Sequence, residues 1–136
     1  MEYGRASGIS ARPERVKSVF ELDVYRLAYQ LSLDVHVASH KFPKTEQYGG
    51  VADQMRRASK SVCANLAEGW GKWSTSAERS HFTRIALGSA TEMQVWLSYA
   101  RDLNFLAPKD AAAHGSRYED VARMLAGLLK NGKKGD

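Results

Sequence analysis

The chain has 136 residues, 43% of them hydrophobic, and a formal net charge of +5. These values predict one globular domain and exclude a disordered chain. The single cysteine, Cys63, excludes an intramolecular disulfide. No stretch approaches the roughly 18 apolar residues of a membrane span. Charged residues interrupt the start of the chain, where a signal peptide needs an apolar run. We therefore expect a soluble, cytoplasmic protein. The positive charge favours a polyanionic partner.

Three parts are predicted along the chain. Residues 1–18 should form a flexible arm, because two glycines and Pro13 interrupt any helical period, and this arm carries four basic residues against two acidic ones. Residues 19–130 should form a helical domain. Residues 131–136 should form a short basic tail that frays from the last helix.

The first helix is predicted from Phe20 to His40, because apolar residues recur at helical spacing and Pro43 disfavours its continuation. Its core face consists of Phe20, Val24, Leu27, Leu31, Val35 and Ala38. A second apolar stripe on the same helix consists of Leu22, Tyr29, Leu33 and Val37. Contiguous exposed apolar surface usually marks a partner surface, so we predict that these four residues form an oligomer interface. The alternatives are that this helix is buried on both sides, or that the arm covers the stripe.

Three further helices follow. The second is predicted from Glu46 to Glu68, with Gly69 as its stop. Its core face consists of Tyr48, Val51, Met55, Ala58, Val62 and Leu66. The third begins at the capping-box pattern Thr75-Ser76-Ala77-Glu78. Its core face consists of Phe82, Ile85, Ser89, Met93, Trp96, Ala100 and Leu103. The fourth begins near Pro108. Its core face consists of Tyr118, Val121, Leu125 and Leu128. Short connections between four helices predict an all-α, antiparallel, up-down-up-down four-helix bundle.

Several short motifs follow one another in a defined order and spacing. They are Phe42-Pro43, Tyr48-Gly49, Arg56-Arg57-Ala58, Asn65-Leu66-Ala67-Glu68-Gly69, and Gly88-Ser89 followed by Glu92. On these motifs the chain resembles, over about residues 20–130, the four-helix-bundle family of 23S ribosomal RNA intervening-sequence proteins. The sequence departs from the family's pattern at Cys63, where proline is usual, and at Val51, where leucine is usual.

The resemblance implies a bundle that assembles into a ring-shaped homopentamer. It also implies a relation to the accessory variability protein of diversity-generating retroelements, which works with a reverse transcriptase and nucleic acid. The family name records that some of its genes lie inside ribosomal RNA genes. It does not describe an activity, so a function has to be argued from the residues.

Four cations in and after the second helix are candidates for nucleic-acid binding. They are Arg56, Arg57, Lys60 and Lys72. Phosphate contacts require cations on an accessible surface, and Arg56 and Lys60 share a helix face. A solvated face with ion pairs to Asp53 or Glu92 explains each of them equally well. Because Glu92 lies near the core face of the third helix, Arg57 is the candidate partner for a structural ion pair with it.

Aromatic residues and histidines provide two further hypotheses. Trp70 and Trp73 flank Lys72, and they either stack on unpaired bases or plug the end of the bundle, which is the alternative that we favour. His36 and His40 have a spacing that can bind a metal on one helix. No third ligand is evident, so we expect no metal.

The sequence lacks a P-loop, a dinucleotide fingerprint, a nucleophile elbow and a CxxC pair, and we expect no cofactor. It therefore predicts a non-enzymatic, homo-oligomeric helical bundle that binds nucleic acid through basic surface residues, with RNA as the first candidate. The alternative is a protein-interaction adaptor, for example for a reverse transcriptase, that uses the surface of the oligomer.

Overall fold

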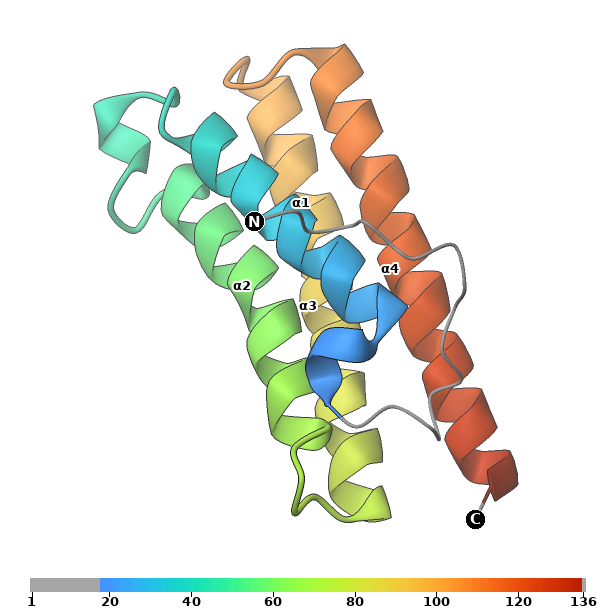
Figure 1. Ribbon diagram of the computed structural model, residues 1–136. Coiled ribbons are helices and arrows are strands. Elements are labelled where there is room, and N and C mark those ends of the chain that lie inside the picture. The colour runs from blue at the N-terminus through green and yellow to red at the C-terminus, as the bar shows by residue number, and fades with distance from the viewer. Residues whose placement is uncertain (1–17, 136) are drawn as a thin grey trace.

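The computed structural model describes residues 18–135, so the predicted arm lies outside the described residues except for Ser18. The elements are η2 (Val19–Glu21), α1 (Asp23–Ser39), η3 (Lys44–Glu46), α2 (Val51–Gly69), α3 (Ser76–Asp102) and α4 (Pro108–Gly135), as Figure 1 shows. The described residues contain no strand, which confirms the all-α prediction. No helix among them is both long and apolar enough to cross a lipid bilayer. Helix α4 continues through five residues of the predicted tail.

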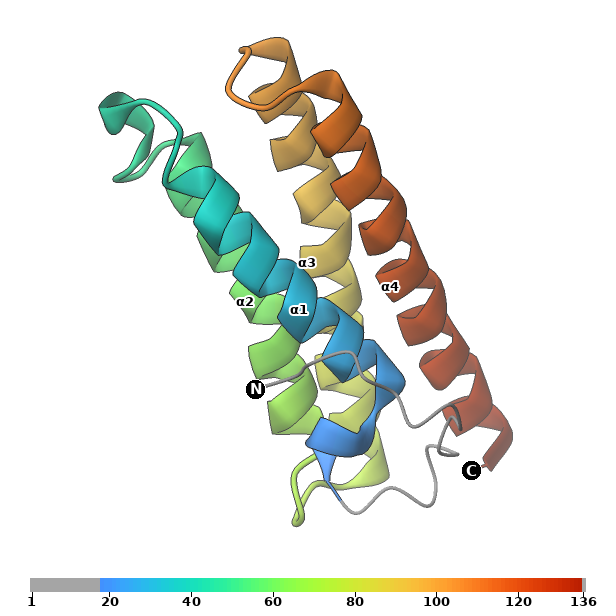
Figure 2. The same cartoon turned by 45° about the horizontal axis from the view of Figure 1, so that its top comes forward.

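The four long helices lie side by side. Helix α1 contacts α2 and α4, and α3 contacts the same two helices. The colours in Figures 1 and 2 show that each long helix runs in the direction opposite to that of the helix before it. Each helix therefore has two neighbours around a shared core, which is the arrangement of a four-helix bundle.

The core of α2 follows the predicted stripe from its first helical residue onward. Five of the six predicted residues are buried, namely Val51, Met55, Ala58, Val62 and Leu66. The prediction is wrong for Tyr48, whose side chain is 93% exposed. Gly49 has a positive φ of 78°, so the backbone turns before α2 begins at Val51 and the helical period does not extend back to Tyr48.

Helix α3 is rotated relative to its predicted orientation. The residues that it buries are Thr83, Ala86, Ala90, Met93, Leu97 and Ala100. At 100° per residue, the centre of this face lies roughly 70° around the helix axis from the predicted one. The buried face is rich in alanine, so α3 approaches its neighbours closely while larger side chains, including Ile85 and Leu103, remain exposed.

The start of α1 exchanges two predicted roles. Phe20, predicted in the core, is 63% exposed, whereas Leu22, predicted at an oligomer interface, is only 3% exposed and belongs to the core. The residues before α1 form a 3-10 turn followed by an extended N-cap at Leu22. The α-helical period therefore does not apply to them.

The connection between α2 and α3 is tightly built. The predicted capping box is confirmed, because the Thr75 side chain accepts from the Glu78 backbone and the Glu78 side chain accepts from the Thr75 backbone. Gly69 ends α2 as predicted and has a second role. A Cβ at this position would lie 2.9 Å from the Cβ of Phe82, so glycine allows the close approach of α3.

A buried hydroxyl provides a test of the core. The Tyr118 side chain is fully buried, and its Oη has no hydrogen-bond partner within the described part of the chain. The neighbouring Ser59 side chain interacts with this hydroxyl, but Ser59 donates its own hydroxyl hydrogen to the Arg56 carbonyl oxygen at 3.1 Å. Tyr118→Phe removes only the unpaired hydroxyl, so chemical denaturation should show unchanged stability or a gain of up to about 1 kcal/mol.

Tyr118→Ala provides the comparison for this test. It removes the buried ring and should cost about 3–5 kcal/mol. A loss of stability in Tyr118→Phe would show that the hydroxyl has a partner in solution.

Candidate nucleic-acid interface

Arg56 is a structural residue that fixes the loop between α1 and α2. Its Nη1 donates to Ser39 Oγ at 2.8 Å and to Gln47 Oε1 at 3.0 Å, and its Nη2 donates to the Gln47 carbonyl oxygen at 2.7 Å. Gln47 in turn donates to the carbonyl oxygens of Ser39 and Phe42. Since the guanidinium is half-buried and engaged by three acceptors, Arg56 is not a free surface cation.

Arg57 is exposed and pairs within its own helix. Its Nε lies 3.1 Å from Asp53 Oδ1, one turn earlier, and the Arg57 side chain is 73% exposed. The Gly49 backbone N–H also donates to Asp53, and this hydrogen bond, followed by Arg57, lowers the pKa of the Asp53 carboxyl. The Asp53 carboxylate therefore neutralises part of the charge that Arg57 could offer to a phosphate.

The predicted ion pair between Arg57 and Glu92 does not form among the described residues. Glu92 is exposed, and its Oε2 accepts from Trp96 Nε1 at 3.1 Å on the same helix. Each of the two residues thus bonds a side chain four positions away on its own helix. The polar contact between α2 and α3 in this region is a hydrogen bond between Ser61 and Ser89 at 2.9 Å.

Lys60 is exposed and has two histidines beside it. Its Nζ lies 3.1 Å from Nδ1 of His36, whose Nε2 lies 3.0 Å from Nε2 of His40. Burial and the neighbouring positive charges of Lys60 and Arg56 lower the pKa of His36. Within the described residues no carboxylate pairs with Lys60, and no cluster of three potential metal ligands includes the histidines.

The two loop tryptophans have different environments. Trp70 is half-buried, donates through Nε1 to Thr83 Oγ1 at 3.3 Å, and is covered by the Arg79 guanidinium 4.8 Å from its ring centre. Trp73 is 87% exposed, with Lys72 Nζ 5.2 Å from its ring centre. Trp70 thus packs against the end of the bundle, while Trp73 presents an open aromatic face beside a cation. The sequence did not indicate the contribution of Arg79.

The four predicted cations do not form one patch. Nine residues of helix, about 14 Å, separate Lys60 from Gly69, and Lys72 lies beyond that point. Lys60 therefore belongs to the contact between α1 and α2, and Lys72 to the loop at the end of the bundle. Arg56 and Arg57 have the structural partners described above.

Three of the four predicted interface residues remain on the surface. Leu33 and Val37 are 38% and 62% exposed, and Tyr29 is half-buried and stacks with Tyr25 at 5.9 Å between ring centres. Leu22 is excluded because it lies in the core. The exposed ring of Phe20 extends the aromatic row, since it contacts Tyr25 edge-on at 5.3 Å.

A second apolar face lies on α3, and only part of it was predicted in the core. The residues on it that are at least 39% exposed are Ile85, Val95, Tyr99 and Leu103. Trp96 borders this face and contacts Tyr99 at 5.9 Å between ring centres. The predicted core stripe contained three of these five residues. The hydrophobic period thus identified them as one face of the helix but did not show that this face points to solvent.

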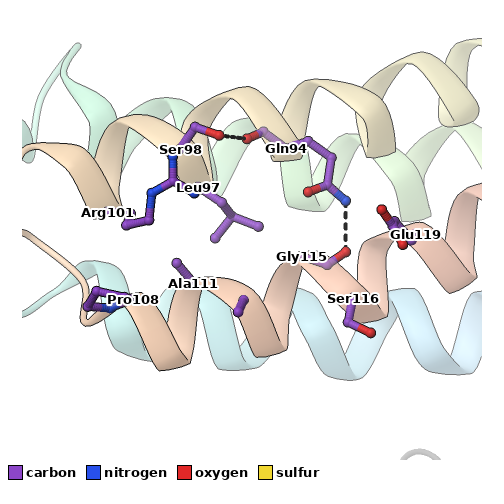
Figure 3. Close-up of a pocket in the computed structure, with 10 residues that line it drawn as sticks. Gln94, Leu97, Ser98, Arg101, Pro108, Ala111, Gly115, Ser116 and Glu119 are labelled. Atoms are coloured by element: carbon purple, nitrogen blue, oxygen red, sulfur yellow. Dashed lines mark hydrogen bonds between the residues drawn. The ribbon is translucent and has the colours of Figure 1, made fainter.

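A groove of about 320 Å³ lies between α3 and α4 (Figure 3). Gln94 Nε2 donates to the Gly115 carbonyl oxygen at 2.7 Å, and a Cβ at position 115 would lie 3.1 Å from Gln94 Oε1. The charged residues that line the groove are one arginine and one glutamate. Arg101 is already held by Asp102 through contacts of 2.8 and 3.2 Å. The groove therefore has no excess of positive charge for a polyanion.

Cys63 is not a reactive thiol. Burial raises its pKa to about 12, so the thiol stays protonated at neutral pH. It lies beside the core, as expected for a small apolar residue.

The fold and surface together define a helical-bundle protein with separated basic sites and exposed apolar faces. Residues 20–127 match the family of 23S rRNA-intervening sequence proteins, and the chain belongs to this family. A search of curated proteins finds no match.

A crystal structure of similar fold comes from Bacteroides thetaiotaomicron VPI-5482. It is described as a protein with unknown function from the S23 ribosomal protein family. The two structures superpose with a TM-score of 0.71 and 16% sequence identity, over 79% of this chain and 95% of that one. At this identity the similarity shows a shared fold.

The neighbouring arginines provide a test of the site. Arg56→Ala leaves the polar groups of Ser39 and Gln47 without their donor, so thermal and chemical denaturation should show a loss of about 2–3 kcal/mol. Arg57→Ala is the matched control, and it should change stability little because exposed pairs one turn apart contribute little. Equal stability of the two variants would contradict the structural role of Arg56.

Proposed function

We propose that this protein is a non-enzymatic, homo-oligomeric helical bundle that works in the cytoplasm. It binds nucleic acid, with RNA as the first candidate. One observation carries the proposal: Lys60 and Lys72 are exposed, and neither has a carboxylate partner among the described residues. A cation without a carboxylate partner can bind a phosphate without first losing an ion pair.

The carboxylates near the contact between α1 and α2 support this proposal because structural hydrogen bonds already occupy them. Glu46 Oε1 accepts from the Val51 backbone at the start of α2 at 2.8 Å. Asp53 accepts from the Gly49 backbone and from Arg57. Acidic groups here stabilise the helix start, whereas Lys60 remains available to a ligand.

The far end of the bundle offers a second contact. Lys72 and the exposed ring of Trp73 combine a cation with an aromatic face, the pair of groups with which proteins hold unpaired nucleotides. Figures 1 and 2 show that η2 and the end of α4 lie at this same end.

Oligomer formation would multiply both contacts. The proposed ring is a homopentamer of up-down-up-down bundles, as the resemblance implies, and it would repeat Lys60 and Lys72 on every subunit. Exposed apolar side chains on two different helices support self-association, since a head-to-tail ring requires two different faces of each subunit. The exposed side chains are Leu33 and Val37 on α1, with the half-buried Tyr29 beside them, and Ile85, Val95, Tyr99 and Leu103 on α3.

A second candidate function is a protein-interaction adaptor, for example for a reverse transcriptase. The groove between α3 and α4 favours it, because this groove has a mixed lining without excess charge and lies on a different part of the molecule from Lys60. The adaptor and the RNA-binding protein differ in one property, since only RNA binding depends steeply on salt.

Salt dependence is the first test. A labelled single-stranded RNA is titrated with the full chain at several salt concentrations, and the logarithm of the binding constant is plotted against the logarithm of the salt concentration. The steepness of this plot should fall by about one in Lys60→Ala and by about one in Lys72→Ala. Arg123→Gln is the control, because Arg123 already pairs with Asp120 at 3.2 Å, and its slope should equal that of the wild type. Absence of binding at low salt would contradict the proposal.

Oligomer size is the second test. Light scattering should give a multiple of the 15.1 kDa chain, five for a pentamer. Val37→Asp and Tyr99→Asp each place a charge on one exposed apolar face and should reduce the mass. Thr91→Asp, at an exposed position on α3 outside the apolar face, is the control. A wild-type mass of one chain would remove the ring.

A further inference from the structure

Three basic side chains from two helices meet at the contact between α1 and α2. Lys60 Nζ is 3.1 Å from His36 Nδ1, and His36 Nε2 is 3.0 Å from His40 Nε2. A lysine ammonium can only donate, so His36 Nδ1 must accept. His36 is then neutral with its proton on Nε2, which it donates to the unprotonated Nε2 of His40.

This chain of hydrogen bonds is complete only while both imidazoles are neutral. A proton on His36 Nδ1 would point at the Lys60 ammonium, and a proton on His40 Nε2 would point at the N–H of His36. Proton uptake thus converts a chain of donors and acceptors into three donors with no acceptor between them. An oxyanion with several acceptor oxygens is the kind of ligand that satisfies such a set.

Within residues 18–135, no carboxylate supplies such acceptor oxygens to these side chains. The titratable and charged groups that face His36 are His40 on its own helix and Lys60 and Arg56 on α2, and all of them are basic. Their charges and burial lower the pKa of His36 below its usual value near 6.5. Among the described residues, no ion pair brings a carboxylate to any of the three side chains.

Arg56 holds the three groups in place. Its Nη1 donates to Ser39 Oγ, and Ser39 Oγ donates to the His36 carbonyl oxygen at 2.8 Å. The last turn of α1, which carries His36 and leads into the C-cap residue His40, is thereby fixed to the helix that carries Lys60. The positions of the donors are set before any ligand arrives, which lowers the entropic cost of binding.

We propose that His36, His40 and Lys60 form a phosphate-binding site that holds a phosphodiester of the bound RNA and binds it more tightly in mildly acidic solution. The inference rests on the proposed RNA binding for the identity of this ligand. The site itself requires only a phosphate group. It adds two histidines to the set of nucleic-acid contacts and makes the interaction depend on pH.

The direction of the pH effect follows from linkage. A bound phosphate favours the protonated imidazoles and raises their pKa, so protonation must in turn favour phosphate by the same factor. If binding raises one histidine pKa by about one unit, affinity increases about tenfold as pH falls from above both pKa values to below both. The gain appears below the usual histidine pKa near 6.5, because the pKa of free His36 is lowered.

The experiment measures affinity for a short labelled single-stranded RNA between about pH 8 and about pH 5.5 at constant salt, with a chelator present to exclude metal binding. Wild type should gain about tenfold, and His36→Gln/His40→Gln should lose most of this gain. His81→Gln/His114→Gln removes the other two histidines of the chain and is the matched control, which should behave as the wild type. An equal gain in all three proteins would overturn the site while leaving RNA binding intact.

A second measurement uses inorganic phosphate and no RNA. The imidazole resonances of the full chain are titrated with pH, with and without phosphate, and phosphate should raise the pKa of His36 and His40 but not those of His81 and His114. If RNA fails to bind at any pH while phosphate still raises these two values, the proposed function falls and the phosphate site stands. If phosphate leaves all four values unchanged, the site is refuted.

Discussion

The arrangement of the bundle depends on the small side chains that α3 turns toward its neighbours. Ala86, Ala90 and Ala100 are buried on this helix with exposures of 0–1%. Side chains of this size let α3 lie close to α2 and α4, and Gly69 extends the close approach to the end of α2. A helix that buries alanines must place its larger apolar residues elsewhere, and Tyr99 and Leu103 consequently lie on the surface. One packing choice thus determines both the tight core and the apolar outer face on which self-association would depend.

The arginine pair in α2 shows how one motif serves two structural purposes. Arg56 faces the loop between α1 and α2 and saturates its guanidinium with oxygens of Ser39 and Gln47, whereas Arg57 faces solvent and bonds Asp53. The contacts of Arg56 are the ones that position the histidines of α1 against Lys60. A residue predicted to touch phosphate directly therefore contributes to the proposed site by positioning the groups that would touch it.

Much of the fold could be predicted from sequence because its determinants are local. The capping box at Thr75, the stripe from Val51 to Leu66 and the buried row of Tyr118, Val121 and Leu125 each lie within one regular helix, where the period of 3.6 residues holds. The errors occur where this condition fails. Tyr48 precedes a glycine with positive φ, and Leu22 precedes α1 in an extended conformation. For α3, both sides of the helix carry apolar residues, so the period alone could not decide which side faces the core.

The candidate site was less predictable than the fold because it depends on contacts between helices. Candidate cations can be found by residue type, but their availability depends on partners such as Gln47, which lies nine residues from Arg56, and His36, which lies twenty-four residues from Lys60. The positions of the carboxylates matter as much as those of the cations. Glu46 and Asp53 are held at the start of α2 by backbone N–H groups, where an anion is favoured by the helix dipole. Since neither acid pairs with Lys60 among the described residues, the start of α2 is stabilised while a positive charge stays free for a ligand.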